Sequence, residues 1–271
     1  MLKIENVTFS YSRKAELIKN FSMTLEKGTV CGLLGKNGAG KSTIIYLMCG
    51  LLRPQQGIID FNGMTPSKRS PQFLEDVFLV PEEFSLPKVS LKQYVEVNAP
   101  FYPNFSMEQL EKYLAIFELN PDLNLGELSM GQKKKAFISF AMACNTGLLI
   151  LDEPTNGLDI SAKRSFRKAI AECMTDEKSI LISTHQVYDV EKILDHVIII
   201  ERNGVLLNES LFNICQKYRF SFTTDRDRAS NALISLEVPG GYNIAEPLDD
   251  PDQETEVNLE TLFELMQSKT I

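Results

Sequence analysis

A glycine-rich stretch near the N-terminus has the residue types and spacing of a phosphate-binding loop. The segment GLLGKNGAGKST fits the pattern G-x-x-x-x-G-K-[ST], after a predicted strand and before a predicted helix. In such loops backbone N–H groups converge on phosphate oxygens, the lysine reaches the β- and γ-phosphates, and the hydroxyl binds Mg²⁺. The segment predicts a nucleotide site in which Lys41 is also catalytic and Ser42 is a metal ligand. Its binding residues are Gly35, Lys36, Asn37, Gly38, Ala39, Gly40, Lys41, Ser42 and Thr43.

Two adjacent carboxylates follow a second apolar stretch. In LLILDEP the apolar residues predict a buried strand, and Asp152 at its carboxyl end is placed to hold Mg²⁺, since open α/β sheets bind ligands there. Adjacent side chains on an extended segment point in different directions. Glu153 would then face an attacking water as general base, a role worth about 10²–10⁴ in rate. The alternative for Glu153 is a solvated loop carboxylate.

A histidine lies at the corresponding end of another predicted strand. His185 directly follows the apolar run SILIST, so it would reach the same edge of a parallel sheet. This position favours a contact with the γ-phosphate over the structural role that a lone histidine usually has. His196, at the start of the next strand, is assigned the structural role.

The segment LSMGQKKKAF has the pattern of a helix N-terminus. Ser129 and Gln132 are spaced as a capping box, and helix N-termini bind anions. The alternative is an ordinary capped helix with an apolar face. The lysines at 133–135 are interpreted as a solvated helix face, although attraction to a nearby phosphate is an alternative.

Strands alternating with helices surround these residues. Near-continuous apolar runs predict a mostly parallel α/β sheet, and the phosphate loop in it indicates a P-loop NTPase core. Short alternating strands at the N-terminus are expected to form an antiparallel β portion. The residue pattern becomes helical over about residues 89–145. Within this range Leu110, Leu114 and Phe117 share one helix face, and Ser106 is the predicted N-cap. We expect a nucleotide-binding domain over 1–205 with this helical subdomain inserted.

Residues 206–271 form a predicted C-terminal α+β extension. YRFSFTT and ALISLEV alternate like strands, Pro239 and the two following glycines mark a turn, and VNLETLFELMQ predicts an amphipathic helix. The acidic stretch over 246–256 is interpreted as an exposed loop.

Composition narrows the function classes. A net charge of −8 argues against a nucleic-acid partner, because that role needs an excess of lysine and arginine. Five cysteines stand singly, which favours buried reduced thiols and the cytosol over disulfides or zinc. The sequence begins without a signal peptide, and no apolar run approaches the roughly 20 residues that span a bilayer. A membrane role would therefore need a partner.

Five motifs together resemble the nucleotide-binding subunits of ATP-binding cassette (ABC) transporters. The phosphate loop, LSMGQ, LLILDEP, NGLD and STH occur in that family's order over about residues 2–210. The segment FYPNFSMEQLEKYLAIFEL also resembles the helical region of bacterial exporter-type subunits. The resemblance implies a head-to-tail dimer around two ATP molecules, in which one subunit's LSMGQ helix caps the ATP of the other.

Further site residues follow from the resemblance alone. It implies that Ser129, Gly131 and Gln132 contact the partner's ATP and that Asp159 lies in a loop across the dimer interface. Tyr11 matches the aromatic that stacks on adenine, with a strand-end core aromatic as the alternative. His185 and Glu153 match the family's γ-phosphate histidine and general base.

Two departures from the family pattern stand out. Glu82 occupies the position of the usual glutamine, and a carboxylate can ligate Mg²⁺ at least as well. Met130 replaces the first glycine of the signature, leaving Gly131 to allow close backbone approach.

The leading hypothesis is the ATPase subunit of an exporter-type ABC transporter, using ATP and Mg²⁺. Its predicted partners are a second copy or a homologous subunit and separate transmembrane permease subunits, which would hold it at the cytoplasmic face of the membrane. One alternative is a soluble non-transport ABC ATPase of the iron–sulfur assembly or regulatory kind. Another is a nucleotide-switched binding module with negligible turnover.

Overall fold

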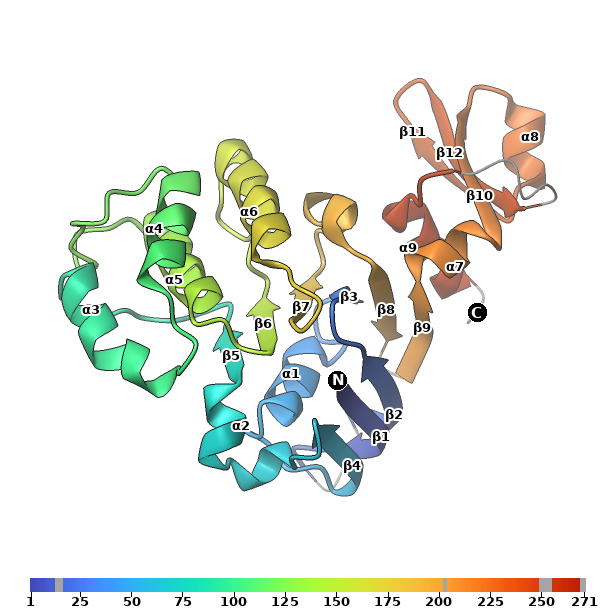
Figure 1. Ribbon diagram of the computed structural model, residues 1–271. Helices are drawn as coiled ribbons and strands as arrows, with labels where there is room; N and C mark the ends of the chain where they lie inside the picture. The colour runs from blue at the N-terminus through green and yellow to red at the C-terminus, as the bar shows by residue number, and fades with distance from the viewer. Residues whose placement is uncertain (13–16, 202–203, 249–254, 269–271) are drawn as a thin grey trace.

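A six-stranded sheet in the order β5-β6-β7-β3-β8-β9 forms the centre of the computed structural model, which describes residues 1–12, 17–201, 204–248 and 255–268 (Figure 1). All neighbouring strands are parallel except the antiparallel pair β8-β9. The strands are β3 (Val30–Leu34), β5 (Val77–Val80), β6 (Leu148–Asp152), β7 (Ser179–Thr184), β8 (His196–Glu201) and β9 (Gly204–Ser210). Every residue of β3, β6 and β7 is buried, which confirms the prediction of a mostly parallel sheet from apolar runs.

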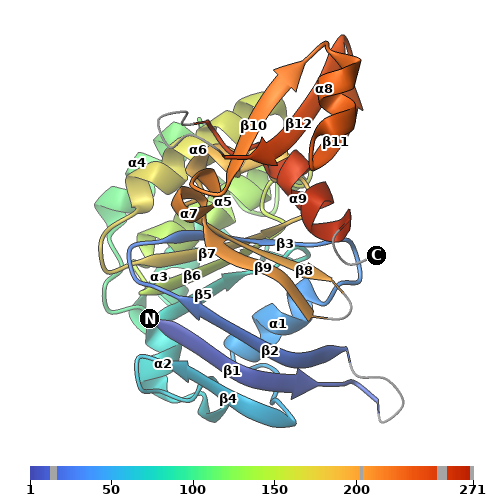
Figure 2. The same ribbon diagram turned by 90° about the vertical axis from the view of Figure 1, so that its right-hand side faces the viewer.

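The predicted N-terminal antiparallel portion is a second sheet in the order β2-β1-β4. Its strands are β1 (Leu2–Phe9), β2 (Ile18–Leu25) and β4 (Gln56–Phe61). Helix α1 (Lys41–Met48) lies between the two sheets (Figure 2), where Ile44 and Ile45 join an apolar cluster contributed by both. The burial of α1 on both sides fixes the loop that precedes it.

Helices cover the opposite face of the main sheet. The block between β5 and β6 contains α3 (Leu91–Asn98), η2 (Ala99–Phe101), α4 (Met107–Ile116) and α5 (Met130–Ala143), as the helical texture over 89–145 predicted. Ser106 caps α4, and Leu110, Leu114 and Phe117 are buried, which confirms the predicted face. Two short helices precede it, η1 (Pro66–Lys68) and α2 (Pro71–Glu75). After β6 come the long helix α6 (Ile160–Cys173) and the short helices η3 (Val187–Asp189) and η4 (Glu191–Ile193).

Phe140 on α5 joins the helical block to the sheet. Its side chain is 1% exposed, and its ring contacts those of Phe78 on β5 and Tyr94 on α3. We expect Phe140→Ala to lower the free energy of unfolding by about 3–5 kcal/mol, because it removes buried area and leaves a cavity. Urea unfolding measures this, with the exposed Phe212→Ala as a control expected within about 0.5 kcal/mol of wild type. A loss under about 1 kcal/mol in Phe140→Ala would contradict the packing described.

The C-terminal segment folds as a small antiparallel sheet with helices. Its elements are α7 (Leu211–Cys215), β10 (Tyr218–Thr223), α8 (Arg226–Asn231), β11 (Ile234–Val238), β12 (Gly241–Pro247) and α9 (Leu259–Ser268), with strand order β10-β12-β11. This confirms the predicted strands, the turn at Pro239 and the amphipathic helix, whereas β12, α7 and α8 were not predicted. The acidic stretch over 246–256 begins inside β12, where Glu246 accepts from Arg228, so an exposed loop is wrong for this residue. Residues 249–254 of the stretch lie outside the described residues.

Two connections join this segment to the main domain. Strand β9 belongs to the main sheet and runs across the boundary predicted at residue 205. Leu259, Leu262 and Leu265 of α9 are buried in the same apolar cluster as the helical face of the main sheet. The division into two domains stays a prediction, and the end of β9 at Ser210 is the better place for its boundary.

The cysteines are free thiols, four of them buried and Cys215 half-buried. Within the described ranges, none of the helices combines the length and the apolar character needed to cross a bilayer.

Candidate active site

Strand pairing brings the predicted site residues to one edge of the main sheet. Asp152 on β6 pairs with Ser183 on β7, and Leu34 on β3 pairs with Thr184. The residues that follow these strands, Gly35, Glu153 and His185, therefore emerge side by side at the carboxyl edge, where α/β folds bind ligands.

The phosphate loop connects β3 to α1 and needs its glycines. A Cβ on Gly35 would lie 2.8 Å from the carbonyl oxygen of Ile200, and Gly40 has a φ of 101°. Gly40 caps α1 without a side-chain hydrogen bond, so the first N–H groups of the helix are available to an anion. Lys36 and Asn37 are exposed, as is Gly38, whereas Ala39 and Thr43 are buried.

Lys41 is a buried cation at the start of α1. Its Nζ donates to the carbonyl oxygen of Gly35 at 2.7 Å and lies 3.5 Å from Oε1 of Glu153. The ammonium is therefore held beside the loop whose N–H groups would receive a phosphate.

Tyr11 lies beside the phosphate loop and outside the core. Its hydroxyl is 3.2 Å from Oγ1 of Thr43, and its ring meets Phe9 edge-on with centroids 4.9 Å apart. The side chain is 62% exposed, so the alternative of a buried strand-end aromatic is wrong.

Asp152 is a buried carboxylate with two hydroxyl partners. It accepts hydrogen bonds from Ser183 and from Ser42 of the phosphate loop. Burial raises the pKa of Asp152 above its usual range, the two hydroxyls act against this rise, and the charges of Glu153 and Glu82 add to it. A cation beside Asp152 would relieve the cost of burying its charge.

Glu153 turns out of the strand instead of continuing it. Its φ of 45° is left-handed, so the expectation of an extended Asp152-Glu153 segment is wrong. The turn directs Oε1 of Glu153 to within 2.8 Å of Nδ1 of His185, while the His185 N–H approaches Oε2 at 3.4 Å. Glu153 is 4% exposed, which also excludes the solvated loop carboxylate.

The LSMGQ segment forms the predicted helix start. Ser129 Oγ accepts from the Gln132 N–H at 3.3 Å, and Gln132 Oε1 accepts from the Ser129 N–H at 3.0 Å, which confirms the capping box at the start of α5. A Cβ on Gly131 would meet only the carbonyl oxygen of Gly157, at 3.6 Å, an ordinary contact. No close approach among the described residues therefore requires a glycine at 131. Ser129 and Gln132 are exposed, as is Met130 at 62%.

Comparison with known proteins identifies the family. A family model described as ABC transporter matches residues 18–156, more than half of the chain. The chain belongs to the ABC transporter family. As an ATP-binding subunit of this family, it binds and hydrolyses ATP.

Known proteins of the same family are similar to this ABC subunit over most of its length. It is 26% identical over 269 residues to the ABC transporter ATP-binding protein YtrB of Bacillus subtilis, covering 92% of each chain. It is 32% identical to the zinc uptake system ATP-binding protein ZurA of Listeria innocua, covering 74% of this chain and 83% of that one. A solved ATP-binding subunit of an ABC transporter superposes with a TM-score of 0.71 at 26% identity, covering 79% of this chain and 91% of the other.

Two further residues that the sequence predicted for the site, Asp159 and Glu82, lie respectively at the end of the loop after β6 and against that loop. Asp159 is exposed and caps α6, accepting from the Ala162 N–H at 2.7 Å. Glu82 is exposed after β5 and accepts from the Asn156 amide at 2.9 Å. The loop over 154–159 therefore joins the residue in the usual glutamine position to the start of α6.

Lys134 contacts the loop that carries Glu153, and this contact was not predicted from the sequence. Lys134 is buried, and its Nζ donates to the carbonyl oxygens of Glu153 at 3.0 Å and Asn156 at 2.9 Å, so a solvated helix face is wrong for this lysine. Burial lowers the pKa of Lys134, and nearby carboxylates act in the opposite direction. Its spacing from the buried Ile138 and Ala141, at i+4 and i+7, is the signal that could have revealed it.

Proposed function

We propose that two copies of this chain, or one copy and a homologous subunit, close around two ATP–Mg²⁺ and thereby drive a separate membrane permease. The observation that supports this most is the convergence of Lys41, Glu153 and His185 at the mouth of the phosphate loop. ABC ATPase subunits dimerise and pair with membrane permeases. That this particular chain does both is the proposal.

The proposed chemistry assigns one task to each converging side chain. Glu153 takes the proton of the attacking water, in a site where it is shielded from bulk solvent. His185 holds the Glu153 carboxylate through Nδ1 and leaves its other ring nitrogen for the γ-phosphate. Lys41, already 3.5 Å from Glu153, stabilises the charge that develops on the phosphoryl oxygens.

The proposed metal site consists of oxygen donors, which Mg²⁺ prefers. The Ser42 hydroxyl, the Asp152 carboxylate to which it donates and the Glu82 carboxylate after β5 would supply them. No three His, Cys, Asp or Glu side chains cluster as a metal cage anywhere in the described part of the chain. This fits Mg²⁺, which usually takes its remaining ligands from phosphates and water. When bound, it would neutralise charge on the phosphate oxygens.

Tyr11 is proposed to stack on adenine, because an exposed ring beside Thr43 lies at the end of the phosphate loop. Tyr11→Ala is expected to weaken ATP binding by about 5–150-fold, since base–aromatic stacking contributes about 1–3 kcal/mol. Tyr11→Phe keeps the ring and is expected to bind within about threefold of wild type. Calorimetric titration with ATP measures both, and equal affinities for Tyr11→Ala and wild type would exclude stacking.

Exposed residues at the carboxyl edge support a dimer interface there. Met130 at the start of α5 is 62% exposed, and Ile160 at the start of α6 is 88% exposed. No contact within the described part of the chain requires a glycine at position 131. A partner's nucleotide that approaches the backbone there would require one. Ser129, Gln132 and Asp159 are proposed to line the same interface.

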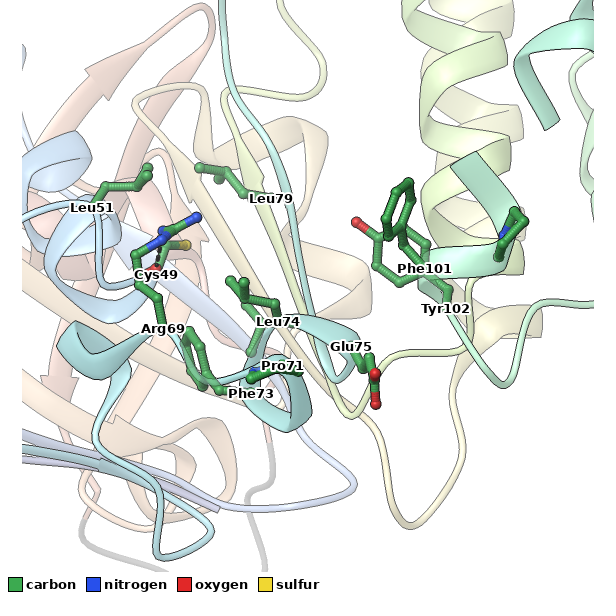
Figure 3. Close-up of a pocket in the computed structure, with 12 residues that line it drawn as sticks. Cys49, Leu51, Arg69, Pro71, Phe73, Leu74, Glu75, Leu79, Phe101 and Tyr102 are labelled. Carbon is green, nitrogen blue, oxygen red and sulfur yellow. Dashed lines mark hydrogen bonds between the residues drawn. The ribbon is translucent and has the colours of Figure 1, made fainter. Parts of the chain in front are cut away.

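A groove between α2 and η2 supports docking of the permease (Figure 3). It has a volume of about 500 Å³ and is lined largely by apolar side chains, including the exposed Leu51, Leu74 and Phe101. Such a surface beside the helical block fits an amphipathic helix of a membrane subunit, and docking there would place the chain at the cytoplasmic face. Export is proposed only because residues 101–119 resemble the helical region of exporter-type subunits. The relatives do not support a direction, since one of them is named for zinc uptake.

Purification from membranes tests this function. A tagged chain expressed in its native cell is expected to copurify from detergent-solubilised membranes with a multi-span membrane protein, identified by mass spectrometry. The double variant Leu74→Asp/Phe101→Asp should lose this partner and keep ATP hydrolysis, whereas Val97→Asp, exposed on α3, should keep both. Consistent recovery from the soluble fraction alone would favour the non-transport ATPase instead.

A further inference from the structure

Lys134 is a buried cation that anchors another segment. Its side chain is 7% exposed, and both carbonyl oxygens that it holds belong to the loop after β6. Lysine is almost never fully buried unless it is paired, because an unpaired buried charge is costly. The two hydrogen bonds therefore fix this loop on the second turn of α5.

The anchored segment is the turn that carries Glu153. The carbonyl oxygen of Glu153 accepts from the Asn156 N–H at 3.3 Å as well as from Lys134. This turn holds Glu153 at its φ of 45°, a conformation that a non-glycine residue keeps only when its surroundings enforce it. The same turn presents the Asn156 amide to Glu82.

We propose that Lys134 is a positioning residue for Glu153, locking the turn over 153–156 so that the carboxylate stays on His185 beside Lys41. This inference rests on the proposed role of Glu153 as general base. Ser129, the cap of α5, is proposed to face the partner's ATP. The Lys134 contact therefore also links the residue that faces the partner's ATP to the base that acts on the chain's own ATP.

The neighbouring lysines provide matched controls. Lys135 donates to the carbonyl oxygen of Phe117 at 3.1 Å, at the end of α4 and away from the turn. Lys133 is half-buried on the same helix turn. Both carry the same charge as Lys134 and lie on the same helix. Replacing them therefore shows the effect of losing a lysine from this helix without losing the hydrogen bonds to the turn.

The test measures ATP hydrolysis and ATP affinity for Lys134→Met, which keeps the length of the side chain and removes its donors. The expected kcat is about 10–100-fold below wild type with the Kd for ATP within about twofold, because misplacing a reacting group by about 1 Å has effects of that size. Lys133→Met and Lys135→Met are expected to keep kcat within about threefold of wild type.

A double-mutant cycle separates positioning from general structural support. In the Glu153→Gln background, Lys134→Met should lower the residual hydrolysis by less than about twofold, since the group through which it acts is already gone. The same loss in both backgrounds, or an unchanged kcat for Lys134→Met, would overturn the inference. If Lys134→Met does not fold, as judged by circular dichroism, Lys134→Gln takes its place with the same two criteria. A wrong assignment of Glu153 itself would appear separately, as undiminished hydrolysis by Glu153→Gln alone.

Discussion

A Glu153→Gln chain is expected to hydrolyse ATP at least about 100-fold more slowly than wild type and to accumulate as an ATP-bound dimer. Glutamine keeps the size of the side chain, so His185 retains an oxygen acceptor at the position of Oε1. The amide cannot take a proton from water, so the hydrolysis that is proposed to reopen the dimer becomes slow. Steady-state phosphate release and size-exclusion chromatography with ATP measure the two effects.

The matched control for this prediction is Glu83→Gln. Glu83 is an exposed carboxylate next to Glu82, and its replacement is expected to leave turnover within about twofold of wild type. Turnover by Glu153→Gln close to that of wild type would mean that another group takes the proton, and the role proposed for Glu153 would be wrong.

Ser129→Arg is expected to abolish the ATP-dependent dimer while leaving ATP binding to the phosphate loop within about threefold of wild type. The exposed start of α5 is proposed to meet the partner's γ-phosphate, and an arginine there would fill the space that closure needs. Sedimentation of the Glu153→Gln/Ser129→Arg chain with ATP measures the dimer, and nucleotide titration measures binding.

Ser90→Arg separates this effect from the loss of a helix cap. Ser90 forms the same capping box at the start of α3, with Gln93 as its partner. Removing either cap costs about 0.5–2 kcal/mol of stability, so both variants should be destabilised alike. Only Ser129→Arg should lose the dimer; an equal loss in both would show that a weakened helix, and not a blocked interface, was responsible.

Much of the site was predictable because its signals are local. The glycines around Lys41 are needed by the turn they form, so their spacing identifies the loop directly. Apolar runs ending at Asp152 and Thr184 predicted strands of one parallel sheet, and parallel strands bring their following residues to one edge. The capping box at Ser129 was predicted for the same reason, since its partners lie three residues apart.

The features that the sequence did not predict depend on contacts between distant segments. The left-handed turn at Glu153 is held partly from α5, so the residues around it predicted the end of the strand at Asp152 but not the left-handed backbone that follows. Lys134 stands in a run of three lysines that is typical of a solvated face, and only packing against the loop after β6 buries it. Strand β12 is central in its sheet because β10 and β11 pair with it from either side.

The most direct test of the account asks whether each ATP is capped by the other subunit. Ser129→Arg and Lys41→Ala chains are each expected to be nearly inactive alone. Mixed in equal amounts, they should recover up to about one half of wild-type hydrolysis, because only mixed pairs contain an intact composite site and each mixed dimer has one such site where the wild-type dimer has two. A mixture no more active than its separate components would contradict a site shared between two subunits.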